Sequence, residues 1–162
     1  LLREEYRGEI CLIGNKKMPD PLAGLYMLRK YGPEGLEAFV RNVASFAPPS
    51  ETLRHVGRLS NTYGSIFLMP PLFAQICLEK PAAKVVIPRS GALAEPMLLY
   101  QKPAAPAKEK IRGFFDSAAF RELMADYQMP AIGDNRFRIE KSCWALATEE
   151  ELEIVFHAFH KK

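Results

Sequence analysis

The chain has 162 residues, of which 48% are hydrophobic and 25% charged, and it carries a formal net charge of +3 at pH 7. This length and composition are typical of one globular domain with a hydrophobic core, and no apolar stretch is long enough to predict insertion into a membrane. The small positive charge, spread over scattered pairs of basic residues, argues against a nucleic-acid partner.

The first part of the chain predicts short strands that alternate with helices. Residues 9–13 and 65–69 are apolar runs typical of buried strands. Asp20 is suited to cap a helix that begins at Pro21, and Gly32 and Pro33 should end that helix. The next helix is predicted from a single apolar stripe, which comprises Leu36, Phe39, Val40 and Val43.

The middle of the chain predicts two further helices and two further strands. Ser50 should cap a helix whose apolar face consists of Leu53, Val56 and Leu59. Pro70 and Pro71 should open a helix that runs through Cys77. Residues 85–87 and 97–101 are the third and fourth predicted strands.

Beyond residue 101 the pattern is helical. Two apolar faces occur there, one formed by Ile111, Phe114 and Phe115 and the other by Phe120, Leu123, Met124 and Tyr127. A last helix should begin after Thr148, because Glu151 stands three residues on and completes a capping box. Its apolar stripe comprises Leu152, Val155, Phe156 and Phe159. Strands that alternate with helices predict an α/β fold with one mainly parallel sheet flanked by helices.

Few residues suggest catalysis or metal binding. Cys11, Cys77 and Cys143 lie in apolar contexts, have no metal-ligand spacing and are interpreted as small buried side chains. His157 and His160 are three residues apart on the last helix, and we interpret them as exposed rather than as metal ligands. No glycine-rich phosphate loop or nucleophile motif is present. The sequence therefore predicts neither an enzyme nor a bound metal or cofactor.

Three segments, taken in order, carry a resemblance to a known family. They are EEYRGEICLIGNKKMPDPLAGLYMLRKYGPEGLEAF, VVIPRSGALAEPMLLYQKPA and KIRGFFDSAAFRELMADYQMPAIGDN. Together they resemble the type II periplasmic solute-binding proteins of ABC transporters, particularly the branch that includes iron(III) and aminophosphonate binders. The resemblance implies that residues 1–135 form the second lobe and its returning helices, and that residues 136–162 form a C-terminal tail with a helix packed on this lobe.

The resemblance also implies a function and partners. The chain would be a ligand-binding lobe for a small anion or organic acid, located in the periplasm or otherwise outside the cytoplasm. Its partners would be a small-molecule ligand, the missing first lobe of the same protein and an ABC-transporter permease. The alternative is the same fold reused as a sensor or interaction domain of a cytoplasmic or regulatory protein, and a weaker one is an enzyme related by fold alone.

Candidate ligand residues follow from where ligands bind in open α/β sheets, at the carboxyl ends of strands. The loop after the first strand offers Asn15, Lys16, Lys17 and Asp20, with backbone N–H donors expected near residues 20–22. Met69 follows the second strand, where iron-binding relatives have tyrosines, and its soft thioether argues against iron(III). By resemblance, Glu95 would lie near the hinge between lobes, although an ordinary surface loop is an equal alternative.

Overall fold

The protein is described here from a computed structural model that covers residues 1–58, 62–89, 91–94, 100, 102, 104, 106–127, 129, 139–140 and 146–161. The chain divides into two compact units. The sheet unit comprises Leu1–Glu95 and Ile139–Lys162, and the helical unit comprises Pro96–Arg138. The first unit is therefore built from both ends of the chain.

The sheet unit contains a three-stranded parallel sheet. Its strands are β1 (Ile10–Ile13), β2 (Val43–Ala47) and β3 (Ile66–Leu68), in the spatial order β2-β1-β3. In the register of the central strand, Cys11 lies opposite Ser45 on one side and Phe67 on the other. The predicted α/β architecture with a parallel sheet is confirmed, and so are the predicted strands at residues 9–13 and 65–69.

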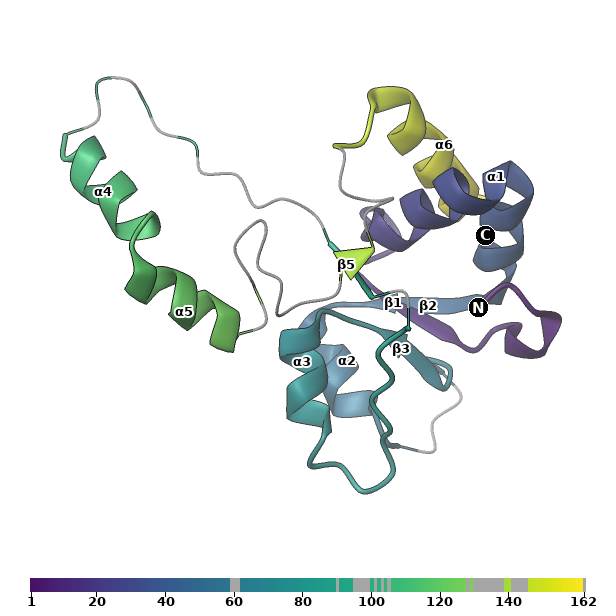
Figure 1. Ribbon diagram of the computed structural model, residues 1–162. Helices are drawn as coiled ribbons and strands as arrows, with labels where there is room; N and C mark the ends of the chain where they lie inside the picture. The colour runs from purple at the N-terminus through teal and green to yellow at the C-terminus, as the bar shows by residue number, and fades with distance from the viewer. Residues whose placement is uncertain are drawn as a thin grey trace. The chain divides into compact units, whose positions relative to one another are not determined.

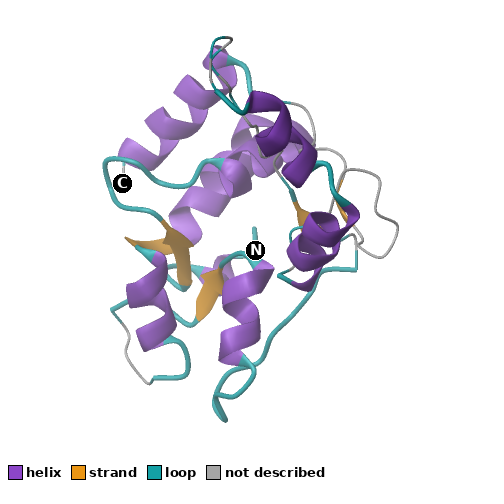
Figure 2. Ribbon diagram, turned by 90° about the vertical axis from the view of Figure 1, so that its left-hand side faces the viewer, coloured by secondary structure: helices purple, strands orange, loops and turns teal. Residues whose placement is uncertain are grey.

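Helices cover both faces of this sheet. Figure 1 shows α1 (Leu22–Asn42) and α6 (Glu149–His160) on one side of the strands, and α2 (Pro49–His55) and α3 (Pro71–Cys77) on the other. A short 3₁₀ helix, η1 (Glu4–Tyr6), precedes β1. The strands are short, so helices make up most of the regular structure (Figure 2). Among the described residues no helix is long and apolar enough to cross a membrane.

The main hydrophobic core lies between the sheet and the α1–α6 pair. Ile10 and Leu12 of β1 point into it, whereas Cys11 between them lies beside Ser45 and Thr52 on the other face, as the two-residue period of a strand requires. The remaining buried members of the core come from α1, the start of β2 and α6: Ala23, Leu25, Met27, Leu36, Phe39, Val40, Val43, Val155 and Phe159.

The predicted break within α1, the predicted start and end of α3 and the predicted start of α6 are confirmed. Gly32 interrupts α1 with φ of +70°, followed by Pro33, so the predicted break between two helical stretches lies where expected. α3 begins at Pro71 and ends at Cys77. Thr148 and Glu151 form the predicted capping box at the start of α6, in which the Thr148 hydroxyl accepts from the Glu151 N–H at 3.2 Å.

Several predicted elements are wrong or were missed. Residues 85–87 form no strand, and Val86 and Ile87 are 72% and 74% exposed, because no strand among the described residues pairs with this short apolar run. Most of residues 97–101 lie outside the described part of the chain. Ser50 does not cap α2, which instead begins after Pro48. β2 was not predicted from the sequence, and neither was the two-stranded parallel sheet of β4 (Ala92–Leu93) and β5 (Ile139–Glu140).

The helical unit contains α4 (Lys108–Phe115) and α5 (Ala118–Asp126), within the stretch predicted to be helical. The Ser117 hydroxyl caps α5 by accepting from the Phe120 N–H at 3.1 Å. Phe114, Phe115 and Phe120 pack ring against ring, with centroids 4.8–5.5 Å apart. Most of the large apolar side chains of these two helices are nevertheless exposed.

Candidate functional site

The topology of the sheet marks one edge as the place for a ligand. The connection that leaves β1 leads to α1 on one face of the sheet, whereas the connection that leaves the adjacent β3 leads to α3 on the other (Figure 1). Ligands of open parallel sheets bind beside the carboxyl ends of strands at such a divergence. We call this side of the sheet the carboxyl edge.

The loop after β1, which comprises residues 14–20 and is called the edge loop, is held in one conformation by its own hydrogen bonds. The Asn15 side-chain oxygen accepts from the N–H groups of Lys17 at 2.9 Å and Met18 at 3.0 Å. Gly14 and Pro19 form an antiparallel bridge that closes the loop at its base. These bonds leave Lys16, Lys17 and Met18 exposed at its tip. Asn15 therefore positions the loop rather than offering its carbonyl to a ligand.

Gly14 allows the edge loop to close this tightly. Its φ is +123°, and a Cβ atom placed there would lie 2.7 Å from the carbonyl oxygen of Met18 and 2.9 Å from the Cα of Pro19. Only glycine adopts such a conformation without strain and leaves room for so close a backbone approach. The conformation of the loop thus depends on this residue.

Asp20 acts as a helix cap rather than as a free carboxylate. Its Oδ1 accepts from the Leu22 N–H at 2.9 Å, and its own N–H donates to the Ile13 carbonyl at 3.0 Å. Pro21 between them has no N–H. The backbone donors expected near residues 20–22 are therefore already used, and this part of the expectation is corrected. Positive charge at the edge comes instead from Lys16 and Lys17, whose ammonium groups form no ion pair within the described residues.

Met69 lies at the same edge as the loop. Leu68 of β3 is in register with Leu12 of β1, so Met69 and Ile13, which follow them, leave the sheet side by side. Met69 is partly buried, and its apolar thioether offers no ligand atom for a hard cation. The structure thus brings five of the six predicted site residues to the carboxyl edge. The sixth, Glu95, lies outside the described residues.

Within the part of the chain that the structure describes, the cysteines and histidines, which were considered as possible nucleophiles or metal ligands, are not among the residues of the carboxyl edge. Cys11 and Cys77 are buried free thiols, and burial raises the pKa of Cys11, so it is not an activated nucleophile. Cys143 lies outside the described part of the chain. His157 and His160 are exposed on α6. No cluster of three histidine, cysteine, aspartate or glutamate side chains suited to a metal ion occurs within the described ranges.

A polar cluster that was not predicted from the sequence lies between α2 and the segment before β3. The Tyr63 hydroxyl donates to Glu51, and this bond raises the pKa of Tyr63. The Tyr63 ring also packs on His55, with centroids 4.2 Å apart. Glu51 and His55 are four residues apart on one helix face, but nothing in the sequence indicates that Tyr63 lies against them. The cluster attaches the segment before β3 to α2.

Comparison with known proteins decides the family. Residues 1–142 match the family of bacterial extracellular solute-binding proteins, which is most of the chain. The chain belongs to this family. No curated protein and no solved structure matches it significantly.

The family match covers both segments of the carboxyl edge, the edge loop and the end of β3. Membership indicates a solute-binding protein with a small-molecule ligand, in the context of an ABC transporter and outside the cytoplasm. The family consists of binding proteins rather than enzymes. The resemblance identified from the sequence is therefore confirmed at the level of the family.

Proposed function

We propose that this solute-binding protein holds a small anion or organic acid at the carboxyl edge, between the edge loop and Met69. The observation that supports this proposal is the pair of exposed lysines, Lys16 and Lys17, on a hydrogen-bonded loop beside the diverging connections of β1 and β3. The nearest carboxylate of the loop, Asp20, is used as a helix cap. The loop therefore presents net positive charge to a solute.

The donor set favours an anion over a metal ion. Two ammonium groups attract phosphonate, phosphate or carboxylate, whereas iron(III) requires hard oxygen ligands that Met69 does not supply. Within the branch that the sequence resembles, we therefore propose a solute closer to the phosphonates than to iron. The first lobe of the same protein would complete the site by closing over it, and an ABC-transporter permease in the periplasmic context would receive the solute.

The test is calorimetric titration of the protein with both lobes present, using phosphate, methylphosphonate, sulfate and succinate, with glucose and spermidine as neutral and cationic probes. Lys16→Gln and Lys17→Gln should each weaken the best anion about fivefold, which is roughly 1 kcal/mol. Lys84→Gln is the matched control, because Lys84 is an exposed lysine that lies beyond the far end of α3.

Two outcomes would contradict the proposal. One is a best ligand that is neutral or cationic. The other is an anion whose affinity changes by less than about twofold, roughly 0.4 kcal/mol, in both edge-loop variants. If the protein with both lobes present responds to none of these solutes, the alternative of a sensor or interaction domain is favoured.

A further inference from the structure

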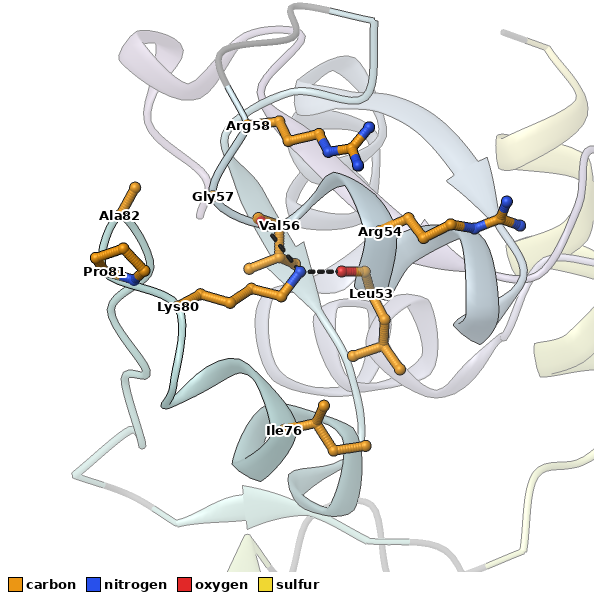
Figure 3. A pocket seen from close by; sticks show the side chains of 9 residues that line it. All are labelled: Leu53, Arg54, Val56, Gly57, Arg58, Ile76, Lys80, Pro81 and Ala82. Atoms are coloured by element: carbon orange, nitrogen blue, oxygen red, sulfur yellow. Dashed lines mark hydrogen bonds between the residues drawn. The ribbon is translucent and has the colours of Figure 1, made fainter.

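A second surface of the sheet unit has the features of a binding site. A hollow of about 480 Å³ lies where the end of α2 meets the segment that follows α3 (Figure 3). The residues that line it are Leu53, Arg54, Val56, Gly57, Arg58, Ile76, Lys80, Pro81 and Ala82. None of them belongs to the edge loop or to the segment that follows β3. We call this surface the α2–α3 hollow.

Lys80 fixes the geometry of the hollow. Its Nζ donates to the carbonyl oxygens of Leu53, in the last turn of α2, and, at 3.2 Å, of Val56, the residue that follows α2 (Figure 3). A cation at this position also interacts favourably with the negative end of the helix dipole. An ammonium group has three donors, so one donor remains for another acceptor.

Two arginines add charge that is not neutralised. Arg54 and Arg58 are exposed, and Figure 3 shows both side chains extended in the same direction at the rim of the hollow, away from Pro81 and Ala82. Arg54 donates only to the Ser50 carbonyl, at 3.4 Å, and neither arginine forms an ion pair within the described residues. None of the nine lining residues is acidic. The hollow therefore carries three positive charges without a carboxylate among its lining residues.

The remainder of the hollow is apolar. Ile76 of α3 is 54% exposed and lies beside Leu53 of α2, while Pro81 and Ala82 form the opposite wall. Leu78, just after α3, is 66% exposed and enlarges the apolar surface nearby. Arginine is enriched among the residues that dominate the binding energy of protein interfaces, so an exposed apolar surface with two unpaired guanidinium groups at its rim is suited to a protein partner.

We propose that the α2–α3 hollow docks an acidic segment of another protein, in which an apolar side chain is flanked by carboxylates. The apolar side chain would cover Ile76 and Leu53, and the carboxylates would pair with Arg54, Arg58 and the free donor of Lys80. The hollow is open to solvent and would enclose too little of a small solute to bind it tightly, which favours a macromolecular partner. This inference does not depend on the proposed solute site.

The test uses the whole chain and a labelled octapeptide, fluorescein-Gly-Glu-Asp-Leu-Phe-Glu-Asp-Gly-amide, whose binding is followed by fluorescence anisotropy at low ionic strength. A second peptide with Gln and Asn in place of Glu and Asp measures the contribution of charge. Arg58→Gln and Ile76→Ser are the test variants, because both side chains are exposed and their replacement leaves the core intact. Arg41→Gln and Ile154→Ser are matched controls on α1 and α6.

The acidic peptide should bind saturably, and each test variant should raise its Kd about fivefold or more, whereas the controls should change it less than about twofold. Amide signals of residues 53–58 and 76–82 should shift in NMR spectra on addition of the peptide. The proposal is overturned if the acidic peptide does not bind, or if test and control variants behave alike. Tighter binding of phosphatidylserine vesicles or polyadenylate at the same arginines would also overturn it, in favour of a lipid or nucleic-acid partner.

Discussion

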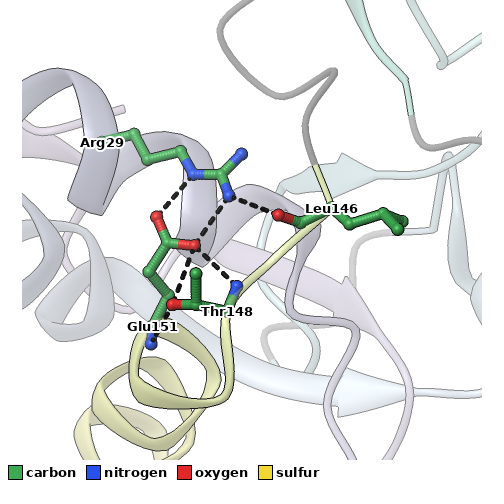
Figure 4. Close-up of polar contacts among 4 residues, drawn as sticks. All are labelled: Arg29, Leu146, Thr148 and Glu151. Carbon is green, nitrogen blue, oxygen red and sulfur yellow. Dashed lines mark hydrogen bonds and ion pairs between the residues drawn. The ribbon is translucent and has the colours of Figure 1, made fainter.

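At the scale of single residues, one ion pair joins parts of the chain that are far apart in sequence. The Arg29 guanidinium of α1 donates to both carboxylate oxygens of Glu151 in α6, at 2.7 Å each, and also to the Leu146 carbonyl at 3.2 Å (Figure 4). Glu151 also accepts from the Thr148 N–H at 2.9 Å. Hydrogen bonds from Arg29, followed by that from Thr148, lower the pKa of Glu151 from 4.5 to about 2.

This lowered pKa predicts how stability depends on pH. Because the folded carboxyl group has a pKa below its unfolded value, its contribution is complete above pH 4.5 and is lost as the pH falls toward about 2. Glu151→Gln should lower the free energy of unfolding by about 2 kcal/mol at pH 7, a figure that allows for partial solvent exposure. Urea unfolding at pH 7 and pH 3 measures both effects.

Glu150→Gln is the control for this prediction, because Glu150 lies in the same helical turn and is exposed. It should change stability by less than about 0.5 kcal/mol. The interpretation fails if Glu151→Gln retains the acid sensitivity of the natural chain between pH 5 and pH 3. It also fails if Glu150→Gln destabilises the chain equally.

At the scale of elements, the sequence correctly predicted those helix boundaries that are determined by nearby residues. A proline opens α3, a capping box opens α6, and Gly32 interrupts α1, so each boundary depends on residues within one turn of it. β2 was missed because its signal is ambiguous. Val43 continues the stripe of Leu36, Phe39 and Val40 at helical spacing, and only pairing with the distant β1 makes residues 43–47 a strand.

The candidate site shows the same division between local and long-range information. The carboxyl edge could be predicted from the strand-loop-helix order alone, because ligand position follows topology in open α/β sheets. The hydrogen bonds that each polar side chain of the edge loop forms could not be predicted in this way. Asn15 and Asp20 satisfy donors of their own loop and helix, a choice that depends on backbone geometry rather than on residue type. The α2–α3 hollow was not predicted because it joins segments that meet only in the fold.

The edge loop gives a prediction at this scale. Gly14→Ala should lower the free energy of unfolding by more than about 1 kcal/mol, because alanine is strained at positive φ and its Cβ would meet the backbone of Met18 and Pro19. Gly113→Ala makes the same chemical change inside α4, where a Cβ meets nothing within 4 Å. There it should stabilise the helix by about 0.5–1 kcal/mol. Urea unfolding and hydrogen exchange measure the two effects, and a neutral Gly14→Ala would show that the loop is not constrained.

At the scale of the whole molecule, the core depends on α6, which returns from the far end of the sequence. Phe159 is 4% exposed, and its ring meets Phe46 of β2 edge to face, with centroids 5.5 Å apart. Gly24 of α1 permits α6 to pack closely against α1, because a Cβ atom at Gly24 would lie 2.6 Å from the Val155 side chain. The sheet unit therefore cannot complete its core from its N-terminal segment alone.

This arrangement predicts that replacing one phenylalanine destabilises the sheet unit, whereas replacing another does not. Phe159→Ala removes a buried ring and should lower the free energy of unfolding of this unit by about 3–4 kcal/mol. Phe114→Ala removes a ring that is 57% exposed in the helical unit, which lies outside that core, and should leave the sheet unit unchanged. Hydrogen exchange at the amides of residues 10–13 reports the stability of the central strand in both variants. Faster exchange there in Phe114→Ala would mean that the two units unfold as one, and unchanged exchange in Phe159→Ala would mean that α6 is not required for the core.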